Sequence, residues 1–294
     1  VGLKISLTLT NELYEPHEMT RKVTYLMLAL AIAPGLAMTV GGVLNSHFGW
    51  ISCFCFSTVY GCTLLYLVSK LPETQTCLRF DALEIRALIT SYRSQLAKSS
   101  ILGCGLLMGG ANSFVYVFAT LGPLLNAHIY HLNGTHYGFA SLLPPAGLVI
   151  SLLLSAQLIM KYSLSTLIYI GLAFIGIGIS TMWMNMMNEN AILSLFIPSM
   201  LIYLGIGFVL PNASSIGMKQ SKEKAFASAT LNFLNVGIAT LMVFCLKWFP
   251  INHLTLIEVY LFIWLSMILL HKYCVTKNCS EKSTIEQSLD VASA

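Results

Sequence analysis

Eight long apolar runs constrain the fold of this chain more than any other feature. A membrane-spanning helix needs about 20 mostly apolar residues, and none of these runs alternates with the period of two that marks a strand. The runs cover residues 23–46, 50–69, 99–126, 137–160, 164–186, 191–217, 225–248 and 254–271. Residues 1–10 resemble the last turns of another helix. We therefore expect an all-α, polytopic membrane protein with eight complete spans and the end of one more.

The low charge content agrees with a membrane location. Hydrophobic residues make up 56% of the 294-residue chain and charged residues only 10%, whereas about 25% is usual in a soluble domain. Such a chain lacks the charge to cover its own surface in water. The eight cysteines are scattered, mostly in apolar runs, and predict neither a disulfide framework nor a zinc site. We expect no metal, no cofactor and no nucleic-acid partner.

The basic residues predict the orientation in the membrane. If the first full span runs outward from the cytoplasm, fourteen of the 16 Lys and Arg residues lie in cytoplasmic segments. The opposite side then holds only Lys247. Because cytoplasmic loops carry an excess of Lys and Arg, we expect a multi-pass protein of the inner (plasma) membrane with a cytoplasmic C-terminus.

The longest predicted loop, residues 70–98, divides the chain into parts. Pro72 stops a helix just past the membrane, and a polar, amphipathic segment follows. We expect residues 1–69 to be the remainder of an N-terminal transmembrane half, residues 99–273 to form a C-terminal six-helix half, and residues 274–294 to be a disordered cytoplasmic tail. Six spans after a long cytoplasmic loop suggest one half of a two-half transporter.

The stretch "APGLAMTVGGVLNSHFGW" (residues 33–50) places Pro34 and the pair Gly41-Gly42 inside an apolar run. Two interpretations are open. Proline and glycine are common in membrane helices, where neighbouring helices satisfy the freed backbone groups. Alternatively, the small residues let two helices approach closely, and the proline gives a bend about which two halves rock.

The surrounding motifs resemble those of a known transporter family. The first part of the chain has "LTNELYEPHEMTRKV" before this stretch, "GGVLNSHFGW" at its end and "LPET" after the next helix. The second part has "ATLGPLL", "GIGFVLPNASSIGM" and "AFASATLNFL", which begin at residues 119, 205 and 225. This ordered set resembles major facilitator superfamily drug/proton antiporters, most closely the bicyclomycin and chloramphenicol resistance branch. The resemblance covers nearly the whole chain up to about residue 275.

The resemblance implies a twelve-helix protein, of which this chain holds the end of the fourth helix through the twelfth. It also implies that Pro34, Gly41 and Gly42 form the antiporter signature of the fifth helix, at the interface where the two halves open and close. Glu12 would lie at a cytoplasmic gate.

Two positions depart from the family pattern. An Arg-Asp pair common at the end of the fourth helix is Asn11-Glu12 here, so the acid is kept and the base is lost. Ala37-Met38 stands where relatives often have a second proline. Lys4 lies two turns deeper than Glu12 and is a candidate coupling residue, which either faces a water-filled cavity or extends along its stem to the surface.

A cavity for a hydrophobic compound needs aromatic and amide side chains in an otherwise apolar wall. Asn112 and Tyr116 are four residues apart and share one helix face. Helix packing is the alternative role for the aromatic side chains, and interhelical hydrogen bonding is the alternative for the amides. The candidate cavity residues are Asn112, Tyr116, Phe118, Tyr203, Asn212, Asn232 and Asn235.

Together these observations predict proton-driven export of small, mostly hydrophobic compounds by a monomer in the lipid bilayer, through alternating access about a midplane cavity. The alternatives are a transporter for a specific metabolite, such as a sugar, amino acid or siderophore, and an inactive fragment, because the chain begins within a predicted helix. We do not expect an enzyme, since no acid or histidine pair lies at membrane depth.

Overall fold

The fold is helical throughout the part of the chain that the computed structural model describes. That part comprises residues 29, 33, 35–70, 85–188, 190–219 and 224–272. Within it, seven helical segments are long and apolar enough to cross a membrane. The all-α, polytopic prediction is therefore confirmed. The remaining predicted span, residues 23–46, lies partly outside the described residues, and its described end belongs to a helix over residues 35–48.

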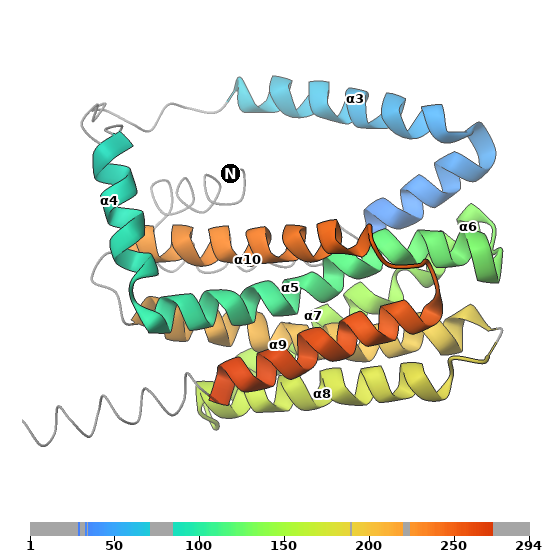
Figure 1. The fold of residues 1–294 in the computed structure, drawn as a ribbon. Helices are drawn as coiled ribbons and strands as arrows, with labels where there is room; N and C mark the ends of the chain where they lie inside the picture. The colour runs from blue at the N-terminus through green and yellow to red at the C-terminus, as the bar shows by residue number, and fades with distance from the viewer. Residues whose placement is uncertain are drawn as a thin grey trace, which may run out of the picture.

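In chain order, the 35–48 helix is followed by α3 (Trp50–Val68), α4 (Ile85–Leu96) and α5 (Ser99–Leu125), and α5 continues into the π-helical turn η2 (Asn126–Tyr130). Next come α6 (Gly134–Ala140), α7 (Leu143–Leu158) and α8 (Leu164–Met184). The π-helical turn η3 (Ile192–Phe196) then leads into α9 (Ile197–Lys219), which is followed by α10 (Lys224–Leu246) and by a helix over His253–Lys272. We call this last element the His253 helix. The long helices α3, α5, α8, α9 and α10 run along one common direction, whereas α4 runs across it (Figure 1). The two ends of the bundle are named the Lys98 end and the His131 end after the residues that lie there.

The predicted span 137–160 is divided into two helices, α6 and α7. Pro144 and Pro145 occupy the first turn of α7, and proline has no N–H with which to continue the hydrogen bonds of a preceding helix. The main-chain N–H of Leu142 bonds to the carbonyl oxygen of Phe139, three residues back, at 3.1 Å. The break therefore follows from the proline pair.

A short turn over residues 131–133 places α6 beside the end of α5. His131 adopts the left-handed conformation, with φ of 52°. The side chain of Asn126 accepts a hydrogen bond from the main-chain N–H of Leu132 at 3.1 Å and donates one to its carbonyl oxygen at 2.9 Å. Because one amide satisfies both main-chain groups, the chain reverses here in a defined geometry.

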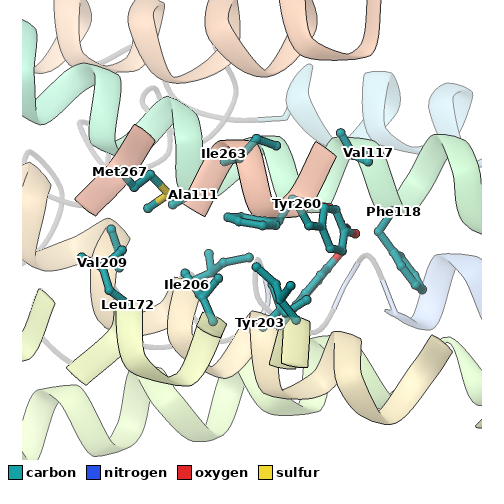
Figure 2. Packing of buried hydrophobic residues seen from close by; sticks show 14 of the residues in the cluster. Ala111, Val117, Phe118, Leu172, Tyr203, Ile206, Val209, Tyr260, Ile263 and Met267 are labelled. Carbon is teal, nitrogen blue, oxygen red and sulfur yellow. Dashed lines mark hydrogen bonds between the residues drawn. The ribbon is translucent and has the colours of Figure 1, made fainter. Parts of the chain in front are cut away.

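The bundle core lies between α5, α9 and the His253 helix. The ring of Phe114 packs edge-on against that of Tyr260, with 4.9 Å between centroids, and the Tyr260 hydroxyl donates to the Phe114 carbonyl oxygen at 3.2 Å. Figure 2 shows Tyr260 on one side of this core and Tyr203 and Ile206 of α9 on the other. The three helices are thus joined by aromatic packing and by one buried hydrogen bond.

Glycines set the distances between neighbouring helices in the bundle. A Cβ atom added at Gly109 would lie 2.7 Å from Ile238 of α10, and one added at Gly105 would collide with Leu234. The GxxxG pair Gly105/Gly109 therefore acts in helix packing, as its spacing predicts. In the same way, a Cβ atom on Gly171 of α8 would lie 2.7 Å from the carbonyl oxygen of Gly205 of α9.

Two helices lie outside the bundle. None of the residues of α3 is buried, and α3 meets the 35–48 helix through Cys53, whose thiol donates to the Gly41 carbonyl oxygen at 3.5 Å. In Figure 1, α4 lies across the Lys98 end. Its Tyr92 ring meets that of Phe226 on α10, with 6.0 Å between centroids. The described part of the predicted loop 70–98 is thus a helix attached to the bundle.

Candidate functional site: the contact between the 35–48 helix and α6

The 35–48 helix packs against α6 with main chain against main chain. A Cβ atom added at Gly42 would collide with the carbonyl oxygen of Gly134 and would lie 3.2 Å from the Cα atom of Gly138. A Cβ atom added at Gly138 would lie 3.1 Å from the Cα atom of Thr39. Side chains at these glycines would push the helices apart, so the contact depends on their absence.

The contact continues beyond α6 to the start of α7. A Cβ atom on Gly35 would lie 3.1 Å from the Cγ atom of Pro145. At the other end, a Cβ atom on Gly134 would lie 2.7 Å from the hydroxyl oxygen of Ser46. The positions in contact on the 35–48 helix recur every three or four residues, which is the spacing of one helix face.

Among the described residues, one side-chain hydrogen bond joins the two sides of this contact. The Thr39 hydroxyl lies 2.9 Å from the carbonyl oxygen of Gly138 and 3.1 Å from that of Gly35 in its own helix. The glycine contact is therefore strengthened by a polar interaction between segments that lie 99 residues apart in sequence.

A cavity of about 580 Å³ lies beside the contact, at the His131 end. The 35–48 helix contributes Gly41 and Asn45 to its wall, and the opposite side contributes His131 and Tyr137. No Lys, Arg, Asp or Glu is among the described residues that line it. Its size is within the range of small-molecule sites, about 300 to 1,000 Å³, and its lining suits an uncharged molecule.

Comparison with known protein families identifies the chain. The model of the Major Facilitator Superfamily matches residues 2–266. The chain belongs to the Major Facilitator Superfamily. A segment of 130 residues is 30% identical to Multidrug resistance protein D of Escherichia coli (strain K12), and it covers 43% of this chain and 32% of that protein. The predicted membership of the superfamily is confirmed, whereas the branch within it stays a prediction.

The structure separates the residues of the predicted fifth-helix signature. Gly42 lies in the contact with α6. Both glycines line the cavity, but a Cβ atom added at Gly41 would meet nothing within 4 Å. Pro34 lies outside the described residues. The interpretation in which small residues permit a close helix approach therefore applies to Gly42.

Three of the predicted cavity residues are buried within the bundle. Phe118 of α5 and Tyr203 of α9 are 2% and 6% exposed, and their rings pack edge-on with 6.0 Å between centroids. The amide of Asn212 donates to the Ser155 hydroxyl of α7 at 3.1 Å and to the Phe208 carbonyl oxygen at 2.7 Å. In this conformation all three contact neighbouring helices, and a role in substrate binding stays a prediction.

The other four candidates lie on α5 and α10. Asn112 is half-buried, whereas Tyr116 and Asn232 are exposed. The amide oxygen of Asn235 is buried without a hydrogen-bond partner in the described part of the chain. Because Gly109 of α5 faces Ile238 of α10, Asn112 lies at least one helical turn closer to the His131 end than Asn235. The seven candidates do not form one cluster.

The two predicted charged residues, Glu12 and Lys4, lie outside the described residues. Sequence reasoning missed four residues of the contact: Gly35, Thr39, Gly134 and Gly138. The spacing of Gly134 and Gly138, four residues apart, is a signal for close helix packing that could have identified them. Nothing in the sequence indicates the hydrogen bond of Thr39, because its acceptor is a main-chain carbonyl.

Proposed function

We propose that this protein is a proton-coupled exporter of small, mostly hydrophobic compounds that works by alternating access. Membership of the Major Facilitator Superfamily supports a transporter rather than an enzyme. The similarity to a protein named for multidrug resistance supports export of drug-like compounds. The motifs quoted above support the bicyclomycin and chloramphenicol resistance branch.

The contact between the 35–48 helix and α6 is the observation that carries the proposal. In the proposed division of the chain, residues 1–69 belong to one half and residues 99–273 to the other, so this contact joins the two halves. Main-chain atoms meet in this contact at Gly42, Gly134 and Gly138. Two such surfaces can separate and close again without repacking a core, as alternating access requires.

We propose that the His131 end faces outward. Lys161 and Lys272 lie in the described part of the chain at the Lys98 end, and Lys247 lies at the His131 end. This distribution supports a cytoplasmic Lys98 end in the inner (plasma) membrane, with a cytoplasmic C-terminus. The cavity and the glycine contact would then close the pathway on the outer side, and Glu12 would lie at the cytoplasmic gate.

The substrate pathway is proposed to include the four candidates that are not fully buried in this conformation: Asn112, Tyr116, Asn232 and Asn235. An aromatic ring and three amides in an apolar surface suit compounds that are mostly hydrophobic and carry a few polar groups. Lys4 is the proposed coupling residue, with Glu12 as the nearby acid.

The test is export by the full-length protein in inverted membrane vesicles. Several structurally unrelated dyes should compete with one another for transport, and a protonophore should abolish it. If only one class of sugar, amino acid or siderophore competes, the protein is a metabolite transporter and the drug-export proposal is wrong.

A disulfide across the contact links this activity to the site. Ser46→Cys and Gly134→Cys together place two thiols where the hydroxyl of Ser46 already approaches residue 134. In a background whose native cysteines are replaced, oxidation should stop dye export and reduction should restore it. Ser46→Cys alone and Gly134→Cys alone are the controls. Neither should respond to oxidation, and the second shows how far a side chain at residue 134 by itself disturbs the contact. Full export with the disulfide formed would mean that the contact does not open during transport.

A further inference from the structure

The break between α6 and α7 leaves the main-chain carbonyl of Gly138 without its usual donor. In a continuous α-helix the N–H of Leu142 would bond to the carbonyl oxygen of Gly138, four residues back. Here that N–H bonds to the carbonyl oxygen of Phe139 instead. The Gly138 oxygen is therefore available to a donor from another helix.

Thr39 provides that donor and has a second acceptor within its own helix. Its hydroxyl oxygen is 2.9 Å from the Gly138 carbonyl oxygen and 3.1 Å from that of Gly35. A threonine hydroxyl carries one hydrogen, so the two carbonyls share or alternate in accepting it. One acceptor lies across the contact, and the other moves with the 35–48 helix.

We propose that Thr39 is a reversible latch at the His131 end. Its hydroxyl bonds to the Gly138 carbonyl while this end is closed, and it bonds to the Gly35 carbonyl alone when the 35–48 helix and α6 separate. The inference rests on the proposed alternating access. Because the hydroxyl keeps an acceptor in both states, opening does not leave it unpaired in an apolar environment, where an unpaired polar group is unfavourable.

The latch contributes a modest preference for the closed state. Interhelical hydrogen bonds in membrane proteins are weak, since the separated helices also find partners. Removing this one should raise the ratio of open to closed molecules about threefold to tenfold, which is about 0.7 to 1.4 kcal/mol at about 1.4 kcal/mol per tenfold change.

The test measures the two populations directly by double electron–electron resonance. Spin labels are attached to Phe48→Cys and Met187→Cys in the full-length protein, with its native cysteines replaced. These side chains are 75% and 87% exposed and lie on the two sides of the His131 end. Thr39→Val removes the hydroxyl while keeping the branched shape, and Thr39→Ser keeps the hydroxyl. Thr240→Val is the matched control, because the Thr240 hydroxyl bonds only to Val236 of its own helix in the described contacts, at 2.9 Å.

The latch predicts a larger long-distance population for Thr39→Val and a wild-type distribution for Thr39→Ser and Thr240→Val. An unchanged distribution for Thr39→Val would overturn it. So would an equal shift for Thr39→Ser or for Thr240→Val, because the hydroxyl at residue 39 would then not be the cause. The readout needs no substrate, so a shift in Thr39→Val alongside an absence of dye export would retain the latch and reject the proposed exporter.

Discussion

Replacing Gly42 by alanine should shift the protein toward the state in which the His131 end is open. The new Cβ atom would collide with the Gly134 carbonyl oxygen and would lie 3.2 Å from the Gly138 Cα atom. These are main-chain atoms of α6, so no side-chain rotation can relieve the contact. Overpacking of this kind is unfavourable by about 1–3 kcal/mol. At about 1.4 kcal/mol per tenfold change, the ratio of open to closed molecules should rise roughly 5-fold to 150-fold.

Gly41→Ala is the matched control for this experiment. Its Cβ atom would meet nothing within 4 Å, while the gain in helix propensity from glycine to alanine is the same at both positions, about 1 kcal/mol. The difference between the two variants therefore isolates the contact with α6. Distances between spin labels at residues 48 and 187 give the populations. Identical distributions in the two variants would refute the claim that Gly42 holds this contact closed.

Three further predictions concern the bundle. Gly205→Ala should lower the thermal unfolding midpoint by several degrees, because its Cβ atom would lie 2.6 Å from a side chain of α8. Gly61→Ala is the control: its Cβ atom would meet nothing within 4 Å, so this substitution should not lower the midpoint. Asn212→Ala and Ser155→Ala should show a coupling of about 0.6 to 1.7 kcal/mol in a double-mutant cycle of unfolding, since their side chains bond at 3.1 Å; strict additivity would contradict this. Trp264→Phe should lower the free energy of unfolding by about 1 kcal/mol, because it removes the indole N–H that donates to a carbonyl oxygen of α8 at 2.8 Å. Calorimetry in detergent measures this change, and an unchanged free energy of unfolding would contradict the prediction.

The positions of the membrane helices could be predicted because the bilayer imposes both their length and their composition. An apolar run of about 20 residues has few alternatives to a helix when its main chain must be hydrogen-bonded in lipid. The division of the span 137–160 was not predicted, although the cause is visible in the sequence. Pro144 and Pro145 lie only a few residues inside the run, and the hydrophobicity that defined the span is the same on both sides of them.

The site was predicted only in part because hydrophobicity does not indicate which face of a membrane helix meets a neighbour. Gly41 and Gly42 differ by one position, or about 100° of helix rotation, yet a Cβ atom added at Gly41 would meet nothing within 4 Å and one added at Gly42 would collide with α6. The same ambiguity affects Tyr116 and Tyr203, of which the first is 37% exposed and the second lies in the core. An apolar helix carries little contrast between its faces, so sequence alone leaves its rotation undetermined.

The most direct test of the account follows the contact during transport. The distance between spin labels at residues 48 and 187 is measured in the full-length protein in proteoliposomes, with and without an exported dye and a proton gradient. We expect two populations: one with a short distance between the labels, in which the 35–48 helix lies against α6, and one with a longer distance. The ratio of the two populations should change when dye and gradient are supplied. A single distance, unchanged under all conditions while dye is being transported, would contradict the claim that this contact opens and closes.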